Sequence, residues 1–135
     1  MRPQYHLRDS PQGLMAWDMR KIAHAAASLP TVEVPLSDIA ELDEDWWFAH
    51  GTTPTPRTIA DHMTLVQQVD RTHPIILDGE GRLMDGMHRI VQALLADDTT
   101  IYAIRLPETP PPDYIGVDPD NLPYGPEPDQ SASSD

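Results

Sequence analysis

Proline and acidic residues are concentrated at the C-terminal end of this 135-residue chain, and this limits where a folded core can form. The last 30 residues hold 8 of the 15 prolines, seven acidic side chains and no basic one. Proline removes backbone donors and favours extended conformations. We therefore expect residues 107–135 to form a proline-rich acidic tail, with roughly the last ten residues disordered.

One part of this tail is richer in apolar side chains. Residues 113–124 include Tyr114, Ile115, Val117 and Leu122. Such side chains can hold a segment against the folded body, so the sequence leaves two alternatives open here, an ordered strap and a free tail.

Charge and cysteine content exclude several classes of protein. The first 105 residues carry 15 acidic and all 9 basic side chains, a net charge of −6, and the whole chain has a formal net charge of −13. A nucleic-acid partner needs a basic surface, so we expect none. The absence of cysteine excludes disulfides, thiol nucleophiles and thiolate metal sites. No run of 18 apolar residues and no signal peptide is evident, so we expect no membrane partner and a cytoplasmic location.

Hydrophobic periodicity predicts a small α+β fold, in which helices flank a small mixed β-sheet. We expect an N-terminal helical extension over residues 1–30 and a core over residues 31–106. The predicted helices cover residues 14–29, 37–42, 55–69 and 86–96, and the predicted strands cover residues 31–36, 74–78, 82–84 and 100–106.

The segment Asp-Gly-Met-His-Arg, residues 85–89, carries the clearest chemical signal. A strand ends at Asp85 and a helix begins at Gly86, so unpaired backbone N–H groups and the helix dipole create a site for an anion. His88 and Arg89 place cations in the first turn, where an anion would compensate them. The structural alternative is that Asp85 caps the helix, Gly86 forms the turn and Arg89 pairs with a nearby acid.

Residues 31–106 resemble the ParB/sulfiredoxin-like nucleotide-binding domain. The similarity rests on an opening strand and turn (residues 32–39), a proline-led strand (residues 74–77), the segment 85–89 before an apolar helix, and a closing strand (residues 101–105). It implies that the chain binds ATP, ADP or CTP together with Mg²⁺. The implied phosphate contacts are Gly86, Met87, His88 and Arg89.

The resemblance also implies a catalytic or metal-binding carboxylate at Asp85. One branch of this superfamily, a free-serine kinase, uses a further acid soon after the opening strand. Glu41, Asp43 and Glu44 are alternatives for that acid.

The chain departs from two branches of the superfamily. Position 87 is methionine where sulfiredoxin needs cysteine, so sulfiredoxin chemistry is excluded. The length leaves no room for the DNA-binding and dimerisation regions of ParB partition proteins, and the acidic charge disfavours a nuclease.

Other polar and aromatic residues have two interpretations each. His73 and Arg57 are candidate phosphate contacts or solvated surface side chains. His62 is interpreted as a surface or capping histidine, because its spacing matches no metal motif. The three aromatic residues at positions 46–48 cannot all face one core, so we expect part of the group to line a groove or cover an edge. Trp46, Trp47 and Phe48, or the acidic tail, are also candidate contacts for a protein partner.

The sequence thus predicts a nucleotide-binding protein. Its expected activity is a Mg²⁺-dependent phosphotransferase or nucleotide hydrolase that acts on a small hydroxyl-bearing metabolite. The alternative is a non-enzymatic module that senses a nucleotide or holds a protein partner. A DNA-associated function is the least favoured reading.

Overall fold

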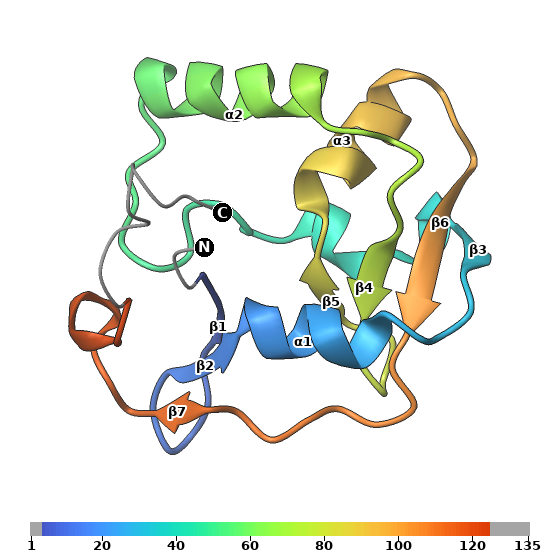
Figure 1. Cartoon of the computed structure of the whole chain (residues 1–135). Helices are drawn as coiled ribbons and strands as arrows, with labels where there is room; N and C mark the ends of the chain where they lie inside the picture. Colours follow the sequence, from blue (N-terminus) through green and yellow to red (C-terminus); the bar gives the residue numbers. More distant parts are fainter. Residues whose placement is uncertain (1–3, 125–135) are drawn as a thin grey trace, which may run out of the picture. The chain divides into compact units, whose positions relative to one another are not determined.

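The structure, a computed structural model, describes residues 4–124. Three α-helices and two small sheets make this part of the chain an α+β protein, as the sequence predicted (Figure 1). The chain divides into two compact units. One is continuous, residues 29–109, and the other combines residues 4–28 with residues 110–124. The predicted disorder at the end of the tail lies outside the described residues.

The continuous unit is built on a four-stranded sheet with the order β3-β6-β4-β5. Its strands are β3 (Val32–Pro35), β4 (Ile75–Leu77), β5 (Leu83–Asp85) and β6 (Thr100–Arg105). β4 runs parallel to β6, while β3 and β5 are antiparallel to their neighbours. The prediction of a mixed sheet is therefore confirmed.

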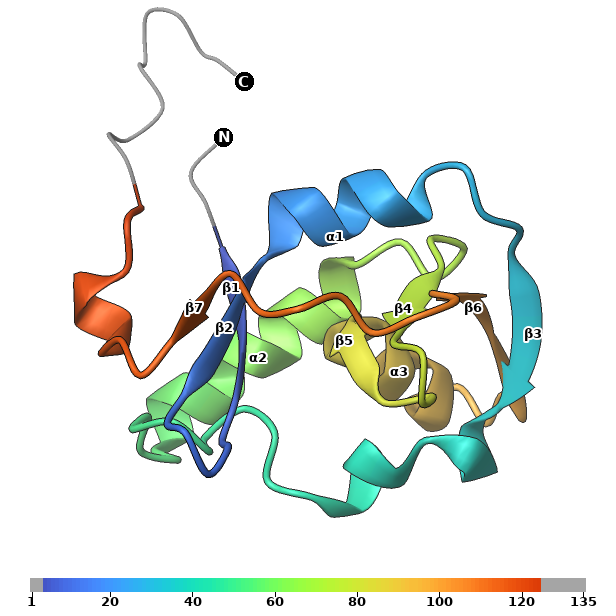
Figure 2. The ribbon, with the colours of Figure 1, turned by 90° about the horizontal axis from the view of Figure 1, so that it is seen from below.

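Two helices complete this unit. α2 spans Pro56–Gln68 and α3 spans Met87–Leu95. Thr55 caps α2 through the Thr58 N–H, and Pro56 occupies the first turn, as expected from the sequence. α3 packs against the sheet and α2 packs against α3 (Figures 1 and 2). The core residues are Val34, Leu36, Ile39, Ile75, Leu77, Leu83, Met87, Ile90, Ala93, Ile101 and Ala103.

The other unit joins the two ends of the described chain. Its three-stranded antiparallel sheet has the order β1-β2-β7, with β1 at Tyr5–Arg8, β2 at Met15–Asp18 and β7 at Tyr114–Ile115. The ordered alternative for residues 113–124 is thus the one observed. The sequence did not predict that this segment pairs with β2.

The predicted helix over residues 14–29 is wrong at its start. β2 occupies residues 15–18, and α1 spans only Met19–Ala26. Asp18 is extended and its carboxylate accepts the N–H of Arg20 at 3.0 Å, which is the arrangement of an N-cap. Met15 and Met19 are four positions apart, which is a helical spacing. The N-cap at Asp18 nevertheless lies between them, so Met15 belongs to β2 and Met19 begins α1.

No helix in residues 4–124 combines the length and the apolar character needed to cross a membrane.

Candidate functional site

The start of α3 has the geometry of an uncapped helix end. β5 ends at Asp85, and Gly86 is the N-cap of α3 with a left-handed φ of +116°. No side chain caps the helix, and its first turn contains no acid. Asp85 therefore does not cap α3, contrary to the structural alternative, and no capping side chain competes with an anion for the amides of the first turn.

Arg89 lies in this first turn, with its side chain only 12% exposed. One terminal nitrogen, Nη2, donates to Oδ2 of Asp85 at 3.0 Å, and Nε is buried without a hydrogen-bond partner. The guanidinium lies against the Gly86 backbone, because a Cβ on Gly86 would come within 2.9 Å of Nη2. The structural alternative is right in one respect, since Arg89 does pair with an acid, and that acid is Asp85.

His88 belongs to an aromatic cluster that sequence reasoning missed. Its Nε2 lies 2.8 Å from Nδ1 of His62 on α2. The indole of Trp47 stacks on both imidazoles, at 4.2 Å from the ring of His62 and 5.1 Å from that of His88. The interpretation of His62 as a surface or capping residue is therefore wrong. α2 and α3 bring it to His88 from 26 positions away, a contact that residue spacing does not reveal.

The environment of His88 favours its neutral form. Burial is the largest cause that lowers the pKa of His88 below 6.5, and the neighbouring charges of His62 and Arg89 act in the same direction. Asp85 opposes them. His88 thus supplies a neutral imidazole beside the start of α3 at neutral pH.

A cavity of about 210 Å³ opens beside the first turns of α3. All three residues of the 46–48 aromatic group line it, in agreement with the expectation that part of this group lines a groove. The full lining is Glu41, Leu42, Glu44, Asp45, Trp46, Trp47, Phe48, Met87 and Val91.

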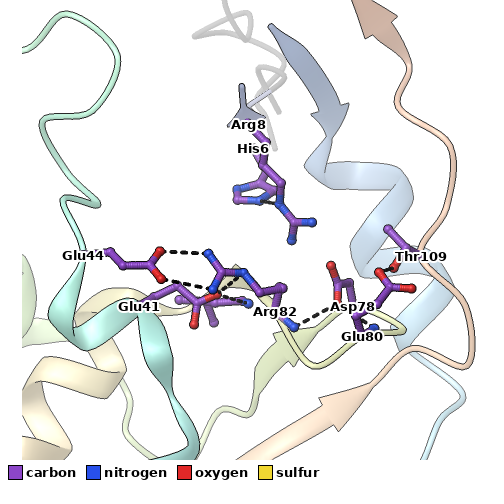
Figure 3. A network of polar contacts seen from close by, with 9 residues as sticks. His6, Arg8, Glu41, Glu44, Asp78, Glu80, Arg82 and Thr109 are labelled. Carbon is purple, nitrogen blue, oxygen red and sulfur yellow. Dashed lines mark hydrogen bonds and ion pairs between the residues drawn. The ribbon is translucent and has the colours of Figure 1, made fainter. Parts of the chain in front are cut away.

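Two of the three acids predicted after the opening strand form a network with Arg82 (Figure 3). Both terminal nitrogens of Arg82 bind the Glu44 carboxylate, at 3.1 and 2.8 Å. Oε2 of Glu41 accepts the backbone N–H of Leu83 at 3.0 Å and forms an ion pair with Arg82, 3.0 Å from its Nε. This pairing lowers the pKa of Glu44. The structure gives Glu41 and Glu44 a role in holding β5, and any catalytic role stays a prediction.

The turn between β4 and β5 depends on a buried acid that the sequence analysis did not single out. Asp78 is 2% exposed, and its Oδ1 accepts the N–H groups of Glu80 and Arg82 at 2.9 and 2.8 Å (Figure 3). Aspartate before a Gly-x-Gly turn is the signal that identifies such a residue in the sequence. Asp78 therefore orients the strand that leads to Asp85.

The remaining predicted site residues lie apart from this arrangement. Asp43, Arg57 and His73 are exposed, and the described contacts at the start of α3 include none of them. Their assigned roles stay predictions.

Comparisons with protein-family models, with curated proteins and with solved structures give no match.

A metal at this site would have few protein ligands. Among residues 4–124, no three His, Asp or Glu side chains gather in a group that could hold a metal ion. Asp85 offers one carboxylate whose side chain is 50% exposed. A single carboxylate is compatible with Mg²⁺ only where phosphate oxygens and water supply the other ligands.

Proposed function

We propose that the chain binds a nucleotide (ATP, ADP or CTP) by its phosphate groups at the start of α3. In this proposal the amides of Met87, His88 and Arg89 and the guanidinium of Arg89 donate to the phosphate oxygens. Glycine at position 86 supplies the positive φ with which the chain enters α3, and Ile75 and Arg89 fill the space that a side chain would take there.

Arg89 is the observation that carries the proposal. Its charge is almost wholly buried in the first turn of a helix, where the dipole disfavours a cation. Only Nη2 is engaged, by a half-exposed carboxylate, while Nε has no partner. A bound phosphate would supply both a second negative charge and the acceptors that these donors lack.

Asp85 is the residue we assign to Mg²⁺. Arg89 engages Oδ2, and Oδ1 is the oxygen we assign to the cation. A bound Mg²⁺ would neutralise charge on the phosphoryl group, and Arg89 would hold that group in place.

Phosphoryl transfer to a small hydroxyl-bearing metabolite, or to water, is a second proposal, and His88 supports it. In the tautomer in which Nε2–H of His88 donates to His62, Nδ1 of the neutral His88 ring can accept the proton of the attacking hydroxyl. If the nucleotide binds but is not turned over, the chain is instead a nucleotide-sensing module.

Thermal melting with ATP, ADP, CTP and GTP, each with and without Mg²⁺, tests nucleotide binding. A ligand at 100 times its Kd adds roughly 2.7 kcal/mol, which raises Tm by on the order of 5–10 °C. We expect such a rise with one nucleotide, a much smaller rise in Arg89→Lys, and an unchanged rise in the control Arg105→Lys, which alters an exposed arginine on β6. A flat response of the native chain to all four nucleotides would refute the proposal. Phosphate release under the same conditions separates an enzyme from a sensor.

A further inference from the structure

The cavity beside Trp46 and Trp47 combines two kinds of wall. The aromatic and apolar residues of the lining, called here the aromatic wall, include Trp46, Trp47, Phe48, Met87 and Val91. Its acidic residues, called here the acidic wall, are Glu41, Glu44 and Asp45, and the lining includes no lysine or arginine.

The acidic wall keeps an excess of negative charge. The Arg82 guanidinium forms ion pairs with both Glu41 and Glu44. One positive charge is therefore shared between two negative charges. Asp45 adds a third carboxylate, which holds the N–H of Phe48 at 3.1 Å through Oδ1. A cation in the cavity would reduce this excess, while an anion would increase it.

The indole of Trp47 contributes an electron-rich aromatic surface to the lining of the cavity. His62 and His88 stack on its ring, and neither imidazole lines the cavity. The part of the indole that lines the cavity is therefore open to a ligand, and aromatic faces attract cations.

We propose that this cavity binds a small organic ammonium compound. Its volume of about 210 Å³ is below the roughly 300–1,000 Å³ of pockets that hold drug-sized ligands, so the occupant is small. The Asp45 carboxylate and the rings of Trp46 and Trp47 are the groups we assign to the ammonium ion. This site goes beyond the proposed nucleotide site and does not depend on it.

Choline and its neutral isostere 3,3-dimethylbutan-1-ol test the proposal on the full chain without nucleotide. The two probes share shape and hydroxyl group and differ in charge. We expect choline to shift the indole N–H signals of Trp46 and Trp47 in NMR spectra, with saturation, while the signal of Trp17 stays in place. The neutral isostere should produce no saturable shift. Equal responses to both probes would overturn the proposal.

Two matched variants identify which carboxylate of the protein binds the choline cation. Asp45→Asn keeps the acceptor for the Phe48 N–H and removes the carboxylate, so choline should bind at least about fivefold more weakly. Asp43→Asn removes a neighbouring exposed acid that does not line the cavity, and it should leave the affinity unchanged. An equal loss in both variants would point to general surface charge and would contradict the assigned site.

Trp46→Leu tests the aromatic wall. This substitution keeps an apolar side chain at a position that is only partly buried, so we expect the variant to fold. A melting curve verifies that it does. Choline affinity should fall while the Trp47 indole signal remains observable. Unchanged affinity in a folded Trp46→Leu variant would contradict a role for this ring.

Discussion

Nδ1 of His62 and Nε2 of His88 lie 2.8 Å apart, so at most one of these two nitrogens carries a proton in the pair. A protonated His88 would place a charge in a half-buried position beside the indole of Trp47. We therefore expect acid to weaken the contact between α2 and α3.

The first prediction concerns this pH dependence. The folded state holds the pKa of His88 below 6.5, so the unfolded chain binds more protons as the pH falls below that value. The contribution of His88 to stability is complete above about pH 6.5 and is lost as the pH falls through the lower, folded pKa. Urea unfolding at pH 7.5, 6.5 and 5.5 should show a shallower pH dependence in His88→Gln than in the native chain. His24→Gln, which changes an exposed histidine on α1, should keep the native slope.

Glu41 should be far more important for stability than Glu44. The Glu41 side chain is 2% exposed and accepts the Leu83 N–H, so Glu41→Ala removes a buried hydrogen bond to a charged group. We expect a loss of about 1–3 kcal/mol in the free energy of unfolding, measured with urea. Glu44→Ala breaks a solvent-exposed pair with the same arginine and should change stability little. Similar losses in both variants would mean that Arg82, and not the Leu83 amide, is the important partner.

Gly86→Ala and Gly81→Ala distinguish two reasons why a position requires glycine, a positive φ and a lack of space for a side chain. Both positions have a positive φ, +116° and +88°, which costs about 1–2 kcal/mol for alanine. At Gly81 a Cβ meets nothing within 4 Å, whereas at Gly86 it would lie 2.5 Å from Cγ2 of Ile75. Gly86→Ala should therefore lose roughly a further 1–3 kcal/mol to overpacking. Equal losses in denaturant unfolding would show that the neighbours of Gly86 can move aside.

Asp113 should anchor β7 to β2. Its Oδ2 accepts the N–H of Asp18 at 2.8 Å, and its Oδ1 pairs with Lys21 at 2.9 Å. In Asp113→Ala we expect amide hydrogen exchange in β2 and β7 to rise at least about tenfold, because a hydrogen bond to a charged group contributes roughly 1.5–3 kcal/mol. Lys21→Ala removes only an exposed partner and should have little effect on exchange. Unchanged exchange in Asp113→Ala would show that the backbone ladder holds β7 without help.

The elements of residues 29–109 could be predicted because their signals are local. Thr55 followed by Pro56 predicts the start of α2. The alternation of Val32 and Val34 with polar residues predicts β3. The β1-β2-β7 sheet could not be predicted, because β7 has two residues and pairs with a strand about one hundred positions earlier. Such a pairing leaves no periodic pattern in either segment.

The candidate site was predictable in part for the same reason. Asp85, Gly86 and Arg89 are consecutive or one turn apart, so one short segment reveals their geometry. His62 reaches His88 only because α2 packs on α3. The carboxylate of Glu41 accepts a hydrogen bond from the backbone N–H of Leu83, which is 42 positions away. Neither contact follows from spacing, because both depend on how the elements pack.

The pairing of β2 with β7 has a consequence for synthesis of the chain. Met15 pairs with Ile115, so a ribosome must add about one hundred residues before β2 can meet this partner. At about 5–20 residues per second, the wait is on the order of 5–20 s. During that time one edge of β2 exposes unpaired amides that another nascent chain could bind. The chain is therefore more exposed to aggregation until the ribosome has added β7.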